Sequence, residues 1–470
     1  MIEAMSAPAR ASSSPPSAQP ALGDPPPLDL KVMLAEYRRR RRHLLEAIGG
    51  EGVALVPSAP ERLRNGHTHY PYRQSSDLSY LTGFPEPEAL LALIPGRKEG
   101  EVVLFCRPRD AERELWEGRR AGVEGAVDRY GVDQAYPIAA LDEEMPKLIA
   151  DRHYLHYPLA READLDVRVM SWLRQVRAQA RGGVRAPQVL VNLDASLHEQ
   201  RLFKDKAEVS LMRRAARVSA EAHRRVMRFC HAGCWEYELE AEFARACAAG
   251  GARHLAYPTI VGGGANACTL HYADNHHLLR DGDLVLIDAG GELHGYAADI
   301  TRTFPVNGRF SPPQRELYEL VLAAQAAAIA KVAPGNRWID PHEAAVKALT
   351  AGLVELGLLK GGRKAVTRLI REEAYKPYFM HRTGHWLGMD VHDVGDYKRD
   401  GDWRRLESGM TLTIEPGIYV GPDQRQAPKR FRGIGIRIED DLLVMADGHE
   451  ILSHQAPKRV DEIESWMASR

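Results

Sequence analysis

The first 200 residues alternate between short apolar runs and longer amphipathic segments. The apolar runs are bounded by glycine, proline or charged residues, which is typical of β-strands. They occupy residues 53–57, 89–95, 102–106 and 189–193. The segments that favour helices are residues 28–49, 118–126 and 141–151. Strands that alternate with helices predict an α/β domain.

A long amphipathic helix is predicted to begin near Lys204. Asp205 and Glu208 have the spacing of a capping box, in which each residue satisfies a backbone N–H at the start of a helix. The stripe that follows recurs every three or four residues, which indicates a helix. It consists of Val209, Met212, Ala216, Ser219, His223, Val226 and Cys230. We interpret His223 as a packed or half-exposed side chain rather than a metal ligand.

Helices and strands are mixed in the rest of the chain. One helix is predicted to begin at Ser311 and to end at 333–335, and another to begin at Asp340. The predicted strands are residues 284–288, 297–304, 410–415 and 433–439. We therefore expect a tail at 1–28, which is rich in proline, alanine and serine and predicted to be disordered, an α/β domain at 29–203 and a second domain at 204–470.

Composition and charge exclude several classes of protein. The chain has 44% hydrophobic and 27% charged residues, as a packed soluble protein does. A net charge of −1 offers no basic field for nucleic acid, and no run approaches the roughly 20 apolar residues of a membrane helix. Five cysteines without paired spacing fit a reducing compartment, so we predict a cytoplasmic protein with no nucleic-acid or membrane partner.

Local motifs exclude other enzyme classes. No His-Glu pair has the second histidine that a zincin helix requires, and the chain has no G-x-S-x-G elbow. The glycines at 262–264 form no phosphate-binding motif.

Two aspartates near a predicted hairpin are the first sign of chemistry. Asp288 ends an apolar run, and glycines follow it. If Glu292 and Gly295 flank a two-residue loop, Asp288 and Asp299 lie directly opposite each other, with Cβ atoms roughly 5 Å apart. Facing carboxylates repel each other, so a cation is expected between them. Arg302 could supply that charge, but a divalent metal ion is the more economical prediction.

Three more segments add polar candidates. His381, His385 and His392 lie in a segment that glycines keep from being a helix. Glu415 ends a predicted strand before a Pro-Gly turn, and the two-residue period of the next strand places Arg437 and Glu439 on one face.

Four carboxylates and one histidine form an oxygen-rich set that suits Mn²⁺ or Mg²⁺, whereas the imidazole also admits Co²⁺, Fe²⁺ or Zn²⁺. Five ligands exceed the needs of one tetrahedral zinc ion. The residues alone therefore predict a two-metal hydrolase. The predicted ligands are Asp288, Asp299, His385, Glu415 and Glu439.

The order and spacing of these ligands resemble the pita-bread metallopeptidases, and most closely the bacterial Xaa-Pro aminopeptidases (aminopeptidase P). The likeness extends to YPYRQSSD at 70–77, YLTGF at 80–84 and WEGRR at 116–120. It also includes HWLG at 385–388 and IEPGIY at 414–419. The resemblance implies an α/β amino-terminal domain followed by an α+β pita-bread catalytic domain. The sequence departs from the family pattern at Arg382, Thr383 and Gly384, which leaves the substrate preference at that edge open.

The resemblance also implies roles for the metal ligands. Asp288 would bind one metal ion, Asp299 and Glu439 would bridge two, and His385 and Glu415 would complete the second. Glu415 would also carry a proton from water to the leaving proline nitrogen. The expected ions are two Mn²⁺, with cobalt, zinc or iron as alternatives.

Other residues take roles by the same resemblance. His392 would stabilise the oxyanion, and His271 and His381 would flank the pocket for proline. Arg437 would orient Glu415 or Asp299. Trp116 would reach the site of a neighbouring subunit, because a homodimer or homotetramer is implied.

The implied substrates are peptides with proline at position 2. A prolidase, which takes dipeptides, is the nearest alternative, and the segments at 70–74 and 116–120 favour the aminopeptidase. Methionine aminopeptidase ranks lower because it usually lacks the large amino-terminal domain, and creatinase lacks the metal carboxylates. A non-enzymatic binding protein on the same fold is the alternative from another class, but such proteins have lost metal ligands.

Overall fold

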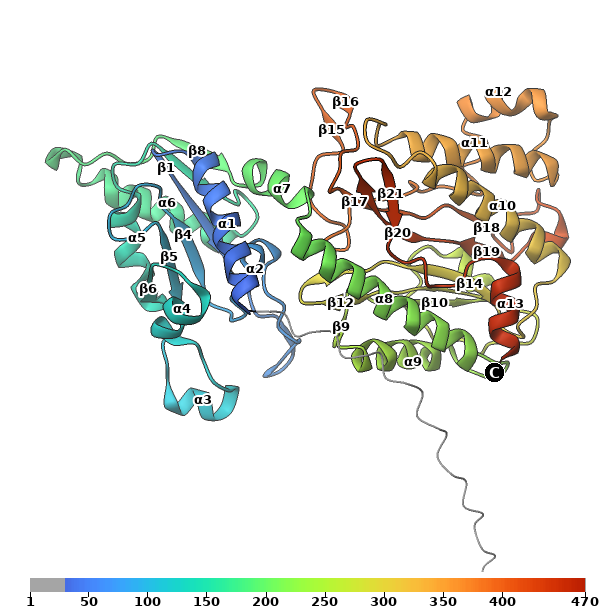
Figure 1. The fold of residues 1–470 in the computed structure, drawn as a ribbon, viewed down its shortest axis with the longest axis horizontal. Helices are drawn as coiled ribbons and strands as arrows, with labels where there is room; N and C mark the ends of the chain where they lie inside the picture. The colour runs from blue at the N-terminus through green and yellow to red at the C-terminus, as the bar shows by residue number, and fades with distance from the viewer. Residues whose placement is uncertain (1–29, 470) are drawn as a thin grey trace, which may run out of the picture.

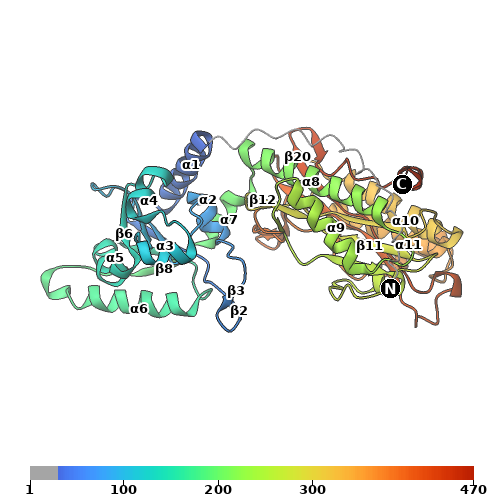
Figure 2. The same ribbon diagram turned by 90° about the horizontal axis from the view of Figure 1, so that it is seen from below.

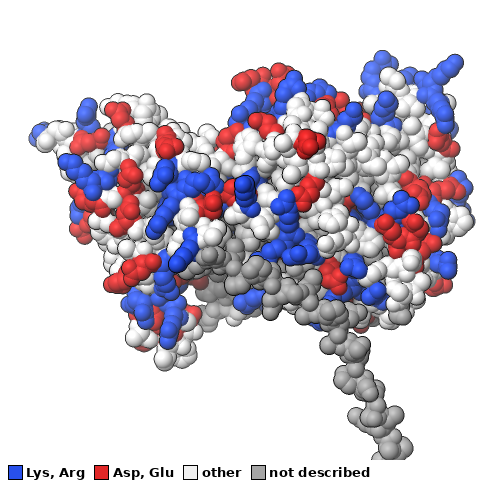
Figure 3. Space-filling model, viewed as in Figure 1, with Lys and Arg blue, Asp and Glu red and all other residues white. Residues whose placement is uncertain are grey.

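The computed structural model describes residues 30–469, so the predicted tail lies outside the described residues. An amino-terminal unit and a larger carboxy-terminal unit lie side by side (Figures 1 and 2). No helix among the described residues is long and apolar enough to cross a membrane. On the face seen in Figure 3, Lys and Arg side chains are interspersed with Asp and Glu over both units.

The amino-terminal unit is built on a six-stranded mixed sheet with the order β6-β5-β4-β1-β7-β8. Its strands are β1 (Gly52–Pro57), β4 (Leu90–Leu93), β5 (Val102–Cys106), β6 (Gln134–Pro137), β7 (Tyr154–Tyr157) and β8 (Val189–Asn192). Its helices are α1 (Leu30–Ile48), α2 (Ser76–Thr82), α3 (Ala111–Glu117), α4 (Gly122–Tyr130), α5 (Leu141–Ile149), α6 (Ala163–Arg177) and α7 (Asp194–Leu202). A short hairpin, β2 (Leu63–Asn65) and β3 (Thr68–His69), projects from it. The predicted α/β architecture is confirmed.

The predicted helix at 118–126 is wrong in its bounds. The Asp110 side chain accepts hydrogen bonds from two backbone N–H groups and begins α3 earlier, at Ala111. Gly118 then ends α3 with a φ of 93°, and Gly122 begins α4 with a φ of 68°. These left-handed conformations favour glycine, so the two glycines separate two short helices where we predicted one.

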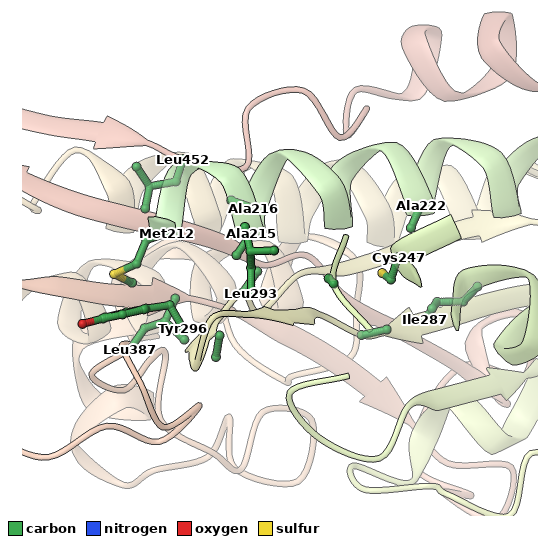
Figure 4. Close-up of a cluster of buried hydrophobic side chains, with 14 of the residues drawn as sticks. Met212, Ala215, Ala216, Ala222, Cys247, Ile287, Leu293, Tyr296, Leu387 and Leu452 are labelled. Carbon is green, nitrogen blue, oxygen red and sulfur yellow. The ribbon is translucent and has the colours of Figure 1, made fainter. Parts of the chain in front are cut away.

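The long helix α8 (Lys206–Phe229) begins as predicted, with a capping box formed by Asp205 and Glu208. One face of it packs on helix α9 (Glu236–Ala249) and on the hairpin of β12 (Gly291–Leu293) and β13 (Tyr296–Ala297). Figure 4 shows Ala215 of this face beside Leu293, and Met212 near Tyr296. The expected packed histidine is confirmed, because His223 is fully buried and its Nε2 lies 3.1 Å from the Ala289 carbonyl oxygen.

Small sheets make up the carboxy-terminal unit, and two packed helix pairs, α8 with α9 and α10 with α11, accompany them. The strands are β9 (His254–Leu255), β10 (Ile260–Gly263), β11 (Leu284–Asp288), β12 (Gly291–Leu293), β13 (Tyr296–Ala297), β14 (Thr301–Pro305), β15 (Lys398–Arg399), β16 (Asp402–Trp403), β17 (Thr411–Ile414), β18 (Gly417–Val420), β19 (Ile434–Arg437), β20 (Asp440–Met445) and β21 (Gly448–Ile451). The other helices are α9 (Glu236–Ala249), α10 (Pro312–Ile329), α11 (Asp340–Glu355), α12 (Val366–Arg371) and α13 (Val460–Ala468).

Two predictions for this unit need correction. The strand expected at 297–304 is interrupted after Ala297 and resumes at Thr301, and the helix expected to end at 333–335 ends at Ile329. The interruption matters for the site, because Asp299 lies within it.

Candidate metal centre

One cavity of about 550 Å³ in the carboxy-terminal unit gathers every site residue that the sequence singled out. Strands β10, β11 and β19 contribute Ile260, Asp288 and Arg437 to it. Glu415 directly follows β17, and the remaining lining residues lie on loops. The predicted residues among its lining are Asp288, Asp299, His385, Glu415, Glu439, His271, His381, His392 and Arg437. No residue of α8, α9, α10 or α11 lines this cavity. The packed helices therefore support the strands without entering the site.

The predicted register of the first two aspartates is wrong by two residues. Asp288 pairs with Thr301 rather than Asp299, and Glu292 pairs with Ala297. The turn residues are consequently His294 and Gly295, with φ angles of 51° and 83°. The predicted common face survives, because a shift of two residues leaves a side chain on the same side of a hairpin.

A tyrosine joins the two aspartates. The Tyr257 hydroxyl lies 2.7 Å from Asp288 Oδ1 and 2.5 Å from Asp299 Oδ1. Burial raises the pKa of Tyr257 well above 10, and the two neighbouring carboxylates add to the effect. Tyr257 is therefore a hydrogen-bond donor at neutral pH and brings the two carboxyl groups together.

Arg437 contacts Asp288, not the Glu415 or Asp299 that we expected. Its Nη2 donates to Asp288 Oδ2 at 2.5 Å, and its Nη1 donates to the Tyr419 hydroxyl at 3.0 Å. The reason is the strand register, which places Arg437 on β19 beside the end of β11. Burial favours the protonated form of Asp288, but the charge of Arg437 and the hydrogen bonds from Arg437, Tyr257 and Asp299 together outweigh it and lower the pKa of that carboxyl.

His385 is oriented so that one ring nitrogen faces the carboxylates. Its Nδ1 lies 2.9 Å from the Trp386 carbonyl oxygen, so Nδ1 carries the proton that it donates there. Its Nε2 lies 3.3 Å from Asp299 Oδ2 and 3.8 Å from Glu415 Oε1. One ligand atom each from Asp299, His385 and Glu439 lies within 4.8 Å of the others. This donor set fits a divalent metal ion.

Three of the carboxyl groups have pKa values above their ordinary range. Burial raises the pKa of Asp299 and of Glu439, and the neighbouring carboxylates raise both further. Burial together with Glu439 raises the pKa of Glu415 to about 8. These buried carboxyl groups resist ionisation because their negative charges would repel one another. A divalent cation among them would stabilise the ionised forms, which is a second indication that the residues fit a metal ion.

The remaining histidines line the same cavity. His381 Nε2 lies 2.9 Å from the Tyr419 hydroxyl, and burial lowers the pKa of His381 to about 4. His392 is only partly covered, and its ring centroid is 4.3 Å from that of His385. The covered part of its ring and the neighbouring His385 lower its pKa. His271 is exposed at the cavity wall. His381 and His392 are therefore neutral near pH 7.

Ion pairs at Asp440 hold the short segment between β19 and β20 that carries Glu439. Arg302, which we considered as a partner for the aspartates, instead pairs with Asp440 at 2.8 Å. Lys458 Nζ lies 2.5 Å from the other oxygen of Asp440. The Glu439 carboxylate accepts a hydrogen bond of 2.6 Å from the Thr301 hydroxyl. These contacts position Glu439 toward the cavity.

Sequence reasoning missed Tyr257 and Tyr419. Tyr257 belongs to no motif, and Tyr419 ends the IEPGIY segment without having been given a role; each acts through partners distant in the chain. The antiparallel pairing of Ile260 with Asp288 could have placed Tyr257 near the site, but that pairing joins segments that no local signal connects.

Comparisons with known proteins agree with this geometry. The model of metallopeptidase family M24 matches residues 210–446, which include all five predicted metal ligands. The chain belongs to metallopeptidase family M24. The model of the aminopeptidase P N-terminal domain matches residues 37–156.

Similar M24 proteins span nearly the whole chain. An Xaa-Pro aminopeptidase from Escherichia coli (strain K12) is 44% identical over 440 residues, which cover 93% of this chain and 99% of that protein. The structure of Pseudomonas aeruginosa aminopeptidase PepP is similar with a TM-score of 0.91 and 53% identity, over 93% of this chain and 98% of that one. A zinc-substituted E. coli aminopeptidase P in complex with product has a TM-score of 0.89 and 43% identity, over 93% and 98% of the two chains.

Proposed function

We propose that this M24 metallopeptidase is an Xaa-Pro aminopeptidase that releases the residue ahead of proline at position 2. One observation carries the proposal: four carboxylates and His385 Nε2 meet in a cavity of about 550 Å³. Its relatives named as Xaa-Pro aminopeptidases align over nearly all of the chain. The complete donor set disfavours a non-enzymatic binding protein.

Two divalent ions, with Mn²⁺ as the first candidate and Co²⁺, Zn²⁺ or Fe²⁺ as alternatives, are proposed to bind this set. Asp288 would hold the first ion, and His385 and Glu415 would hold the second. Asp299 and Glu439 would contact both ions. When bound, such ions supply Lewis-acid chemistry, because they polarise a carbonyl oxygen and make water acidic enough to ionise near neutral pH.

The protonation states of the side chains around the proposed ions suit the hydrolysis of a peptide bond. Glu415 is ionised when it binds metal, so it is proposed to take a proton from water and return it to the leaving nitrogen. Neutral His392 can donate a hydrogen bond to the oxygen on which charge develops. His271 and His381 are proposed to flank the proline ring, and Arg437 orients Asp288 through their 2.5 Å contact.

Peptide length separates the aminopeptidase from a prolidase. We expect the Mn²⁺-loaded protein to release free arginine from Arg-Pro-Pro, as quantified by amino-acid analysis. If arginine is released from the dipeptide Arg-Pro but not from Arg-Pro-Pro, the protein is a prolidase. No release from either peptide, with metal bound, would favour the binding protein.

The stability of the metal-free protein is expected to fall as pH rises from about 4.5, the ordinary pKa of glutamate, to about 8. The pKa of Glu415 is raised by folding to about 8, so the stability that its protonated form contributes is lost as pH rises through that value. Asp299 and Glu439 act in the same direction. Thermal unfolding midpoints in EDTA at three pH values test this expectation. Glu415→Gln should flatten the profile, and an unchanged slope in that variant would contradict the assignment.

We further propose a homodimer or homotetramer, because helix α3 projects from the amino-terminal unit (Figure 1) with Trp116 83% and Leu115 85% exposed. Such an exposed aromatic side chain suits the site of a neighbouring subunit. Light scattering is expected to show an oligomer, and Trp116→Ala should lower kcat/KM about tenfold. Val167→Ala, at an exposed apolar residue of α6, is the control and should change neither the oligomeric state nor kcat/KM. A monomer at working concentration would contradict this proposal.

The remaining proposals concern location and domains. We place the protein in the cytoplasm, where thiols stay reduced. We propose a tail at 1–28, an α/β domain at 29–203 and a catalytic domain at 204–470. The two family models match on either side of the last boundary, which supports it.

A further inference from the structure

The segment at 382–384 places a cation on the wall of the site. Arg382 lines the same cavity as Asp288 and Glu439. Its side chain is exposed, and none of the roles proposed above involves it.

Contacts of both neighbouring residues hold Arg382 at a defined place relative to the metal ligands. On one side, His381 Nε2 lies 2.9 Å from the Tyr419 hydroxyl. On the other, the Thr383 carbonyl oxygen accepts a hydrogen bond of 2.7 Å from the Glu415 backbone N–H. The residues on both sides of Arg382, His381 and Thr383, therefore contact other residues of the site and fix the position of this segment.

Arg382 has no acidic partner in the part of the chain that the structure describes. Among residues 30–469, no carboxylate oxygen lies within 4.0 Å of its guanidinium. Two other arginines in this part of the fold do have an acidic partner. Arg399 and Arg404 pair with Glu199 at 2.5 Å and 2.7 Å. The charge of Arg382 is thus available to a ligand.

A second cation contacts the same indole ring as Arg382. The Arg382 Cζ atom is 5.8 Å from the centroid of the Trp403 ring, and Lys398 Nζ is 4.5 Å from the same centroid. Within the described residues, Lys398 also has no carboxylate within 4.0 Å. The positive potential reaches the surrounding wall, since burial and then Arg382 lower the pKa of His342 to about 4. An anion at this edge of the cavity would be attracted by the unpaired charge of Arg382.

We propose that Arg382 binds a carboxylate of the peptide substrate, so that the enzyme prefers anionic Xaa-Pro peptides. The planar guanidinium offers a pair of donors that match a carboxylate. The carboxylate comes from an acidic side chain or from the free C-terminus of the peptide. This inference rests on the proposed function and specifies its substrate class.

The test compares kcat/KM of the Mn²⁺-loaded wild type and of Arg382→Gln on four peptides. Ala-Pro-Gln-Ala-amide has no carboxylate. Ala-Pro-Glu-Ala-amide and Glu-Pro-Gln-Ala-amide carry one in a side chain, and Ala-Pro-Gln-Ala carries one at its C-terminus. We expect the wild type to favour at least one anionic peptide over the neutral amide by about fivefold, mainly through KM, because the pair is solvent-exposed. The favoured peptide identifies the source of the carboxylate.

The preference should vanish in Arg382→Gln, persist in part in Arg382→Lys and weaken in 0.5 M salt, at which exposed pairs are screened to within about 5 Å. Arg399→Gln is the matched control, since it removes a nearby cation that is already paired with Glu199, and it should leave the preference intact. The inference would be overturned if Arg382→Gln kept the wild-type preference for anionic peptides. It would also be overturned if the variant lost as much kcat/KM on the neutral amide as on the anionic peptides. Failure of the wild type to cleave all four peptides would instead overturn the proposed function, and this inference with it.

Discussion

Glu439→Gln is expected to lower kcat by more than about a thousandfold. Loss of a group that merely supports a metal ligand costs roughly 10- to 100-fold, and Glu439 is proposed to contact both ions directly. An amide keeps the shape of the side chain but not the negative charge that holds a cation. Its oxygen can still accept the hydrogen bond from Thr301, so the local packing should persist.

The same variant should make the metal-free protein more stable, which separates loss of a ligand from loss of the fold. The Glu439 side chain is 1% exposed, and burial together with Asp299 and Asp288 raises its pKa. A neutral amide removes that repulsion, so the gain in the free energy of unfolding should grow with pH above the ordinary pKa of glutamate.

Steady-state kinetics on Arg-Pro-Pro and thermal unfolding in EDTA measure the two effects together. Glu450→Gln is the control, because Glu450 lies on β21 in a surface pair with Arg213 and should leave kcat unchanged. A loss of less than tenfold in Glu439→Gln would mean that the metal site is misassigned. A large loss accompanied by a lower unfolding midpoint would indicate damage to the fold instead.

Removal of metal is expected to abolish activity, and added Mn²⁺ to restore it. The chain itself offers carboxylates, histidines and Arg437 around the cavity, and no serine or cysteine nucleophile lines it among the described residues. The proposed chemistry therefore depends on ions that activate water. Since ligands must lose their protons to bind metal, affinity should rise with pH over the range in which the metal-free protein loses stability.

Dialysis against EDTA, followed by titration with Mn²⁺, Co²⁺, Zn²⁺ or Fe²⁺, tests this dependence and ranks the metals. Restored activity should reach its limit at two ions per chain, as counted by elemental analysis. Full activity after exhaustive dialysis would refute the metal requirement. Saturation at one ion would leave the requirement intact but refute the two-metal assignment.

Several features of the protein follow from local sequence alone. The capping box of Asp205 and Glu208 depends on residues three apart, and the strand that ends at Asp288 depends on one apolar run. Such signals survive any tertiary arrangement, because their partners are near in the chain. The five candidate ligands were recognised in the same way, each from the motif that surrounds it.

The partners of those residues were decided by the tertiary structure. Arg437 contacts Asp288 across 149 residues of sequence, and Tyr257 reaches Asp299 across 42. The hairpin register differs from our prediction by two residues, because the loop at His294 and Gly295 was not the one assumed. Local composition therefore determined which residues could do chemistry. Which of them meet depends on strand register and long-range packing, in which each contact competes with many alternatives that no short segment records.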